Sequence, residues 1–343
     1  MNLTLDDLRD DALHARVQHR IDRKTKPLGA LGRIETLALR LALIQGRDTP
    51  CLCDPQLVVF AADHGIAAHG VSAYPQAVTA QMVLNMLAGG AAVSVLARQH
   101  GLALTVVDCG VRSDLSPRPG LVVAKLAHGS ADCTARAAMT RTECLGALQH
   151  GADIIAKLAG NTLLLGEMGI GNSSAAALLM AKLTGLSIDD CAGRGTGLDH
   201  AGFVRKLAVL RRAIDRHAQA CEPLDVLAAV GGLEIATMAG AVIEAARQRR
   251  VVVVDGFICT AAVAVAEALA PRALQRCVFA HCSAEGGHAR WLRRLGVEPL
   301  LDMGLRLGEG SGAALAWPLF RSAQLLLAEM ASFDSAGVSE RSA

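Results

Sequence analysis

One carboxylate near the C-terminus has the surroundings expected of a catalytic base. Glu309 lies in the stretch Asp302-Met-Gly-Leu-Arg-Leu-Gly-Glu-Gly-Ser-Gly312, directly between Gly308 and Gly310. A structural turn would explain the glycines but not the acid. A base that must touch a flat ring needs both, since glycine lets ring and backbone approach. Partial burial without a cationic partner would raise the pKa of Glu309 and strengthen it as a proton acceptor. The sequence leaves open whether Arg306 pairs with it.

A second glycine-rich segment has the features of an anion site. Gly166-Glu-Met-Gly-Ile-Gly-Asn-Ser-Ser174 follows an apolar run and opens a helical pattern, with Asn172 or Ser173 as the expected helix cap. The free amides at a helix N-terminus suit a phosphate. The glycines are spaced GxxGxG, which differs from the GxGxxG of dinucleotide-binding turns. An ordinary capped turn is the alternative, but such a turn does not need the acid Glu167.

A third glycine-rich segment, Gly193-Arg-Gly-Thr-Gly-Leu-Asp199, precedes a helical pattern that carries Lys206. Taken alone, it fits a flexible connection followed by a surface lysine. Two glycine loops together with a lysine suggest a phosphorylated substrate.

Histidines, cysteines and acids cluster at two places where a metal site could be imagined. Asp63, His64 and His69 form one group, and His281, Cys282, Glu285 and His288 form the other. Neither group has a compact ligand pattern such as HExxH. We therefore expect hydrogen-bonding roles and no metal. Cys51 and Cys53 lack a second pair at zinc-finger spacing, so a structural zinc site is not expected either.

The elements that must position these residues follow from six short apolar runs, each ending in a polar or glycine-rich cluster. The runs span residues 57–61, 104–107, 162–165, 226–230, 251–254 and 277–280. They are apolar throughout, which is typical of strands buried on both faces of a parallel sheet. Helical patterns separate them, for example over residues 78–98, 174–183, 235–247 and 261–270. We predict an α/β fold with a six-stranded parallel sheet flanked by helices, Rossmann-like in arrangement. Ligands bind beyond the carboxyl ends of such strands, where the polar clusters meet.

The two ends of the chain differ from its middle. Apolar residues recur there at helical spacing: Leu31, Ile34, Leu37, Ala38 and Leu41 near the start, and Leu315, Leu319, Ala323 and Leu326 near the end. We predict a large α/β substrate-binding domain over residues 51–300. Residues 1–50 and 301–343 together form a small helical domain.

Charge and hydropathy exclude several classes of partner. The formal net charge of the 343 residues is only +2, without the clustered basic face that nucleic-acid binding needs. No run of about 18 residues is apolar without interruption, so we expect no membrane span. The charged N-terminal segment lacks the apolar centre of a signal peptide, which predicts a cytoplasmic protein. Its ten cysteines are then expected to be reduced thiols, most of them in the core.

The motifs together resemble the nicotinate-nucleotide–dimethylbenzimidazole phosphoribosyltransferases of cobalamin lower-ligand synthesis. The matching segments occur in order over nearly the whole chain: Lys26-Pro-Leu-Gly-Ala-Leu-Gly32, Ala61-Ala-Asp-His-Gly65, Gly166-Glu-Met-Gly-Ile-Gly-Asn172, Gly195-Thr-Gly-Leu-Asp199, Val254-Asp-Gly-Phe257 and Arg306-Leu-Gly-Glu-Gly-Ser-Gly312. The resemblance implies transfer of phosphoribose from nicotinate mononucleotide to 5,6-dimethylbenzimidazole, with inversion at C1′. It also implies a homodimer acting on small molecules, with no cofactor.

The resemblance also implies site residues. It makes Glu309 the proton acceptor and gives Glu167 and Lys206 supporting electrostatic roles near the ribose and phosphate. Further substrate contacts are expected from glycines and small polar residues: Gly171, Asn172, Ser173, Gly195, Gly256, Ser283 and Gly308.

The pocket for the incoming base is less well defined. Residues 70–79 should help to form it, with Ser72 and Tyr74. Tyr74 stands where relatives can have a small polar residue, and Met82, which could equally belong to the core, stands where some carry glutamine. The preferred base therefore stays open among dimethylbenzimidazole, benzimidazole, a phenol and adenine.

Two other function classes are consistent with a sheet of this kind. A dehydrogenase would need the GxGxxG turn and its acidic partner, which the chain lacks. A non-catalytic nucleotide-binding protein would keep the fold and the loops without turnover.

Overall fold

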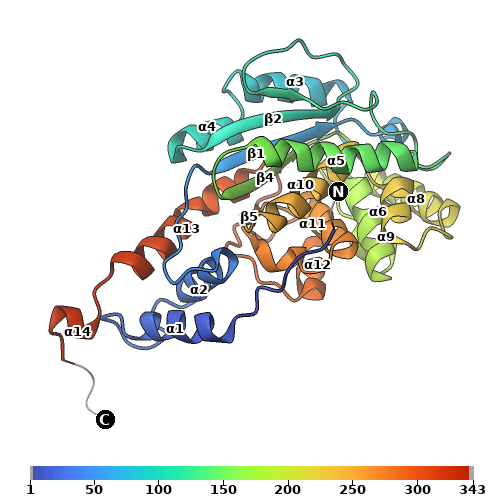
Figure 1. The fold of residues 1–343 in the computed structure, drawn as a ribbon. Coiled ribbons are helices and arrows are strands. Elements are labelled where there is room, and N and C mark those ends of the chain that lie inside the picture. Colours follow the sequence, from blue (N-terminus) through green and yellow to red (C-terminus); the bar gives the residue numbers. More distant parts are fainter. Residues whose placement is uncertain (1–2, 340–343) are drawn as a thin grey trace.

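A parallel sheet of six strands forms the centre of the computed structural model, which describes residues 3–339 (Figure 1). The strand order is β3-β2-β1-β4-β5-β6, and every neighbouring pair is parallel. The strands are β1 (Gln56–Ala62), β2 (Ala103–Gly110), β3 (Leu121–Val123), β4 (Thr162–Met168), β5 (Val251–Val254) and β6 (Cys277–Phe279). The predicted fold class is confirmed.

Both faces of the sheet are buried, which explains the continuous apolar runs. Along β1, Val58 and Phe60 belong to one hydrophobic core, while Leu57 and Val59 belong to the core on the other face. Successive strand residues point to opposite faces, so a strand covered on both sides needs apolar residues throughout.

Two sets of helices cover the two faces. The first core takes residues from α5 (Arg141–Lys157), α6 (Asn172–Thr184), α7 (Ile188–Cys191), α8 (His200–Arg216), α9 (Pro223–Val230), α10 (Leu233–Arg247), α11 (Phe257–Leu269) and α12 (His288–Leu295). The second core takes residues from α1 (Asp11–Asp22), α2 (Arg33–Gln45), α3 (Ala77–Leu87), α4 (Ala92–His100) and α13 (Ser311–Glu329). Three short helices, η1 (Gly65–His69), η2 (Ala273–Arg276) and α14 (Phe333–Ala336), complete the described chain.

One predicted strand is wrong, and one strand was not predicted. Residues 226–230 lie in α9, which begins at Pro223. A short apolar run does not distinguish a buried strand from a buried helix, and proline at the first helical position was the signal for the helix. The sixth strand is instead β3, a three-residue edge strand that is only partly buried. The helix predicted over residues 78–98 is two helices, α3 and α4, with Gly89 at φ +85° between them.

Helices from the two ends of the chain lie side by side, as Figure 1 shows for α2 and α13. Together with α1 they pack into the same core as one face of the sheet. The division into residues 51–300 and a helical domain from both termini stays a prediction. Residues 1–2 and 340–343, which that helical domain includes, lie outside the described residues.

One described stretch, Ala77–His100, meets the length and composition of a membrane-spanning helix. It comprises α3 and α4, and both helices contribute side chains to the second core. Buried helices of water-soluble proteins pass the same test, so the stretch is weak evidence for a span.

Candidate active site

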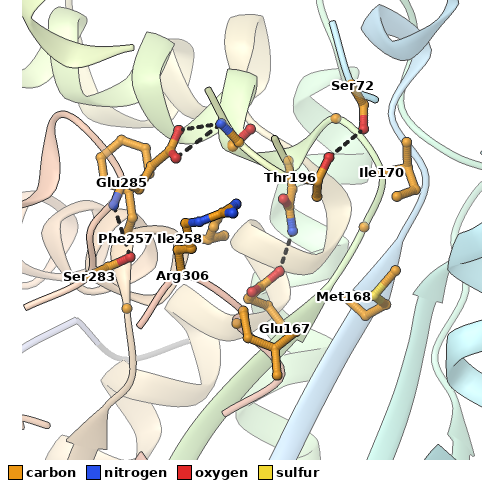
Figure 2. Close-up of a pocket in the computed structure, with 18 of the residues that line it drawn as sticks. Ser72, Glu167, Met168, Ile170, Thr196, Phe257, Ile258, Ser283, Glu285 and Arg306 are labelled. Carbon is orange, nitrogen blue, oxygen red and sulfur yellow. Dashed lines mark hydrogen bonds between the residues drawn. The ribbon is translucent and has the colours of Figure 1, made fainter. Parts of the chain in front are cut away.

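A cavity of about 770 Å³, part of it open to solvent, lies at the carboxyl edge of the sheet. The strand order reverses between β1 and β4, which are neighbours although β2 and β3 separate them in sequence. Open α/β sheets bind ligands at such a switch point. Figure 2 shows the residues that surround the cavity, including Ser72, Glu167, Met168, Ile170, Thr196, Phe257, Ile258, Ser283, Glu285 and Arg306.

The start of α6 forms one wall of the cavity. The helix begins after Gly171, which has a left-handed φ of +101°, and no side chain caps it. The predicted cap by Asn172 or Ser173 is therefore wrong, because both side chains are engaged elsewhere. The Asn172 and Ser174 amides donate to the Gly169 and Gly171 carbonyls. The start of the helix still faces the cavity with the positive end of its dipole, where an anion is favoured.

Lys206 brings a cation to the same corner from α8. Its buried ammonium group donates to Ser173 Oγ and to the Gly193 carbonyl, both at 3.0 Å. A Cβ on Gly195 would lie 3.0 Å from Ser173 Oγ and 3.5 Å from Nζ, so this loop needs glycine there. Burial lowers the pKa of Lys206 to about 8, against the opposing charge of Glu285. The amine is thus mostly charged at neutral pH, and with α6 it forms an anion-binding corner.

Glu285 holds the glycine loop of residues 193–199 against the turn after β6. Both of its carboxylate oxygens accept the Gly195 amide at 3.0 Å. Its own amide donates to Ser283 Oγ at 3.3 Å, and Ser283 also lines the cavity. A carboxylate held in this way fixes the loop that carries Gly195 beside Lys206.

Glu167, near the end of β4, is a buried acid on the cavity wall. The side-chain amide of Asn172 donates to one of its oxygens, and Gly308 lies so close to the other that a Cβ there would collide with it. Burial raises the pKa of Glu167 to about 8, helped by the charges of Asp255, Glu234 and Glu309 and opposed by the Asn172 hydrogen bond. The acid is therefore mostly protonated at neutral pH.

Glu309 occupies a left-handed backbone position, with φ +64°, between Gly308 at +82° and Gly310 at +89°. This conformation costs a residue with a side chain about 1–2 kcal/mol. The residue is 4% exposed, and its carboxylate accepts the Val93 amide at the start of α4 at a long 3.4 Å. Burial raises the pKa of Glu309, the Val93 bond opposes this, and Asp255 adds to it. Leu307 and Gly308 line the cavity, whereas Glu309, the next residue, is not among the described residues that line it.

Asp255, directly after β5, joins the sheet to the helix that follows Glu309. Its buried carboxylate accepts the Ala313 amide at 2.9 Å and the Gly310 amide at 3.3 Å, which are free donors at the start of α13. The His281 ring lies 3.5 Å away. Burial opposes charge on His281, but Asp255 outweighs it and the pKa of His281 is raised. Asp255 therefore fixes the loop that presents Glu309.

Arg306 places a guanidinium group in this site, and that group forms no salt bridge with Glu309. Figure 2 shows its side chain in the middle of the cavity, between Glu285 and Thr196. No salt bridge joins it to a carboxylate anywhere in residues 3–339. A planar fork of donors in this position suits a carboxylate or phosphate of a ligand.

The family model of a phosphoribosyltransferase matches residues 7–338 of the chain. A protein of Variovorax paradoxus is 63% identical over 98% of this chain and 97% of its own, and one of Cupriavidus necator is 56% identical over 97% of each. Both bear the name nicotinate-nucleotide–dimethylbenzimidazole phosphoribosyltransferase. The chain belongs to this phosphoribosyltransferase family. The crystal structure of CobT from Thermus thermophilus superposes with a TM-score of 0.93 at 44% identity, covering 96% of this chain and 99% of that one. The resemblance found in the sequence is thus confirmed.

Most residues expected from the phosphoribosyltransferase resemblance come together at the cavity. Its lining includes Glu167, Gly171, Asn172, Ser173, Gly195, Gly256, Ser283, Gly308 and Ser72. Lys206 stands behind Ser173, and Glu309 stands behind Gly308. Tyr74 is 53% exposed and Met82 is half-buried against the second core, and neither lines the cavity.

The histidines at the edge of the sheet have hydrogen-bonding roles, as expected. His64 pairs with Glu234 at 2.7 Å, fully buried. The His288 ring accepts the Ser283 amide at 2.8 Å and reaches Thr260 Oγ1 at 2.9 Å, and burial lowers the pKa of His288 to about 3. No group of three or more His, Cys, Asp or Glu side chains within residues 3–339 is arranged to hold a metal ion.

Sequence reasoning assigned no function to Asp255 and left the orientation of Arg306 open, and it gave His281 and Glu285 only a general hydrogen-bonding role. Asp255, His281 and Glu285 lie in polar clusters that follow predicted strands, and Arg306 belongs to a segment that matches the family. Those positions were a signal that they reach the sheet edge. The partners of Asp255 and Glu285 are backbone amides of other loops, which no sequence pattern marks.

Proposed function

We propose that this protein transfers the 5-phosphoribosyl group from nicotinate mononucleotide to 5,6-dimethylbenzimidazole, giving α-ribazole 5′-phosphate and nicotinate. The observation that carries the proposal is one site that combines an anion-binding corner with two buried acids of raised pKa, Glu167 and Glu309. Family membership and the names of the relatives support this choice of substrates. The protein acts on these small molecules as a cytoplasmic homodimer, without a cofactor.

The nucleotide's phosphate binds at the corner formed by α6, Gly195 and Lys206. Arg306 adds a second cation for the phosphate or for the nicotinate carboxylate. The pyridine nitrogen is positively charged while bonded to C1′, so its departure neutralises it and needs no general acid. Glu167, beside this position, ionises more readily once a cationic ring is near, because an opposite charge lowers a carboxyl pKa. Its carboxylate then stabilises the oxocarbenium-like C1′.

The incoming benzimidazole attacks C1′ from the face opposite the leaving pyridine, which converts a β-bond into an α-bond. One ring nitrogen forms the new bond, and the other must lose its proton. Glu309 accepts that proton. Its long bond to Val93 and its burial support this role, because both leave a carboxylate that is weakly hydrated and weakly paired. General-base help of this kind is typically worth ~10²–10⁴ in rate.

The deciding experiment incubates the purified protein with nicotinate mononucleotide and dimethylbenzimidazole and identifies the products by mass spectrometry and NMR. We expect nicotinate and the α-anomer of ribazole phosphate. In Glu309→Gln, substrate binding should persist while turnover falls by ~10²–10⁴. If Glu167→Gln abolishes turnover and Glu309→Gln retains it, Glu309 is not the base. If no lower-ligand base yields a product, the proposed function is wrong.

A non-catalytic nucleotide-binding protein on the same fold is the alternative. It predicts binding of nicotinate mononucleotide without any release of nicotinate, and Glu309→Gln would then change nothing. The buried acids favour the enzyme, since a binding protein has no use for a proton acceptor beside the ligand. Competition among dimethylbenzimidazole, benzimidazole, a phenol and adenine in the same assay identifies the preferred acceptor.

A further inference from the structure

Two cysteine thiols lie close together in the segment that joins α2 to β1. Cys51 and Cys53, just before β1, are both exposed, and their Sγ atoms lie 3.0 Å apart. Six other cysteines are buried, Cys282 is partly buried, and Cys221 is exposed. Cys51 and Cys53 thus form a pair of accessible thiols, whereas Cys221 is an exposed cysteine outside such a pair.

The backbone around the pair is held in place by side-chain amides. Gln45 exchanges two hydrogen bonds with Cys51, accepting its amide at 2.9 Å and donating to its carbonyl at 2.8 Å. Asn161, which precedes β4, accepts the Cys53 amide at 2.9 Å and donates to the Cys51 carbonyl at 2.7 Å. Arg321 of α13 donates to the Leu52 carbonyl at 3.2 Å. These hydrogen bonds fix the backbone of residues 51–53 and so hold the two cysteines close together.

We propose that Cys51 and Cys53 form a dithiol site that a small-molecule disulfide, such as glutathione disulfide, oxidises reversibly to an intramolecular disulfide. The sulfurs need to approach by only about 1 Å to reach bonding distance. A tetrahedral zinc ion, with Zn–S bonds of about 2.3 Å, would instead hold two sulfurs roughly 3.8 Å apart. The pair is thus closer to the disulfide than to a metal-bound dithiolate.

The exchange takes place in two balanced steps. The Cys51 thiolate attacks one sulfur of glutathione disulfide and releases one glutathione thiolate, leaving a mixed disulfide on Cys51. The Cys53 thiolate then attacks the Cys51 sulfur and releases the second glutathione. The two protein thiols lose two electrons and two protons, and one glutathione disulfide becomes two glutathione molecules.

The order of attack follows from the contact between the two thiols. The hydrogen bond with Cys51, and burial after it, raise the pKa of Cys53, while Arg321 lowers it. The raised pKa disfavours the Cys53 thiolate, so Cys53 is assigned the second attack and Cys51 the first. Because only the thiolate attacks, oxidation should accelerate about tenfold per pH unit while both thiols are mostly protonated.

The test uses the full-length protein in glutathione buffers of increasing oxidised fraction, followed by acid quench, alkylation and mass spectrometry. Trypsin releases residues 48–98 as one peptide in which Cys51 and Cys53 are the only cysteines. We expect this peptide to lose two hydrogens and to take up no alkyl group, and dithiothreitol should restore two alkylation sites. Cys221 serves as the single-thiol control and should form only a mixed disulfide.

Single variants show whether the two thiols act together. In Cys51→Ser and Cys53→Ser the remaining thiol should carry glutathione or an alkyl group, and neither variant should form the intramolecular disulfide. The proposal is overturned if the wild-type peptide keeps two free thiols in excess glutathione disulfide. It is also overturned if the peptide stops at stable mixed disulfides, as Cys221 does. Neither result depends on the transferase activity, so the proposal stands or falls separately from it.

Discussion

At the scale of single residues, the site contains two acids and a lysine whose pKa values are shifted toward the neutral form by burial. Glu167 gives a stability prediction with a definite sign. Its pKa is about 8 in the folded protein and 4.5 in an exposed glutamate, so the native state binds the proton more tightly than the unfolded chain. The stabilising contribution is complete below pH 4.5 and is lost as the pH rises toward 8. We expect the melting temperature of the wild type to fall over this interval.

Glu167→Gln tests this directly. The glutamine oxygen can still accept the Asn172 hydrogen bond, but the side chain no longer titrates. The melting temperature of the variant relative to the wild type should therefore rise between about pH 5 and about pH 8. Calorimetry at both pH values measures the difference, and groups that titrate in both proteins cancel. A constant offset between the two proteins across this range would show that the pKa of Glu167 is not raised.

Lys206 predicts a pH dependence of nucleotide affinity. Its pKa of about 8 means that the ammonium form, which attracts the phosphate, disappears as the pH passes that value. KM for nicotinate mononucleotide should rise above pH 8, with kcat changing less. Lys206→Met should raise KM at neutral pH by tenfold or more, on the order of 1.5–3 kcal/mol for a charged hydrogen bond, and remove the dependence. Lys182→Met, which removes an ammonium that bonds two backbone carbonyls at the far end of α6, is the matched control. Equal effects of both variants would indicate a loss of structure and not of an anion site.

The residues that the sequence could identify are those whose type is unusual for their surroundings. Glu309 stood out because an acid among glycines is not explained by a turn, and its role as the base stays a prediction. Asp255 was not, because its function is to accept amides of Gly310 and Ala313, which lie more than fifty positions further along the chain. Local pattern carries no information about which distant amides a carboxylate will meet.

At the scale of elements, α5 and α10 cross so closely that backbone meets backbone. A Cβ on Gly151 of α5 would collide with the Thr237 carbonyl and the Ala241 amide of α10. Backbone cannot be displaced cheaply, so Gly151→Ala should cost at least about 1–3 kcal/mol in unfolding free energy. Gly146→Ala on the same helix meets only the flexible end of Leu126, at 3.1 Å. It should be neutral or gain up to about 1 kcal/mol from helix propensity. Denaturant unfolding compares the two, and equal effects would refute the close crossing.

The loop before α13 gives a second prediction at this scale. Asp255→Ala leaves the Gly310 and Ala313 amides without their buried acceptor, which should cost about 1–2 kcal/mol of stability. Because those amides flank Glu309, kcat should fall more than KM changes. Asp255→Asn retains one oxygen acceptor but removes the charge that raises the pKa of Glu309. It should recover part of the lost stability and shift the acid limb of the kcat profile to lower pH. If alanine and asparagine behave alike in both measurements, the carboxylate acts neither as a cap nor as a charge.

Strands were predictable where a long run of residues is buried on both faces of the sheet, and were not predictable where the run is short. β1, β4 and β5 are apolar on both faces, and the predicted runs overlap them. Residues 226–230 share that composition because α9 is buried as deeply as a central strand. β3 was missed because three apolar residues at the edge of the sheet are too short a run to distinguish a strand from a loop. Composition reports burial, and burial alone does not determine the element.

At the scale of the whole molecule, large apolar side chains remain exposed on a chain that otherwise buries its core on both faces of the sheet. Leu28 is 77% exposed and Met303 64%. Leu28 lies in a family-matching segment where a Cβ on Gly29 or Gly32 would meet nothing within 4 Å. Single exposed apolar residues are common, whereas a contiguous apolar patch marks a surface that another molecule covers. The homodimer expected from the family resemblance would supply that cover.

We predict a sedimentation-equilibrium mass of twice 35.6 kDa at micromolar concentration. Leu28→Asp should increase the monomer fraction while leaving the melting temperature of the isolated monomer unchanged, because this side chain has little contact with its own chain. Leu145→Asp, which charges a 49% exposed leucine on α5, is the control and should leave the dimer intact. A monomeric wild type would contradict the dimer. A dimeric Leu28→Asp would place the interface elsewhere, and loss of dimer in both variants would point to unfolding, which circular dichroism distinguishes.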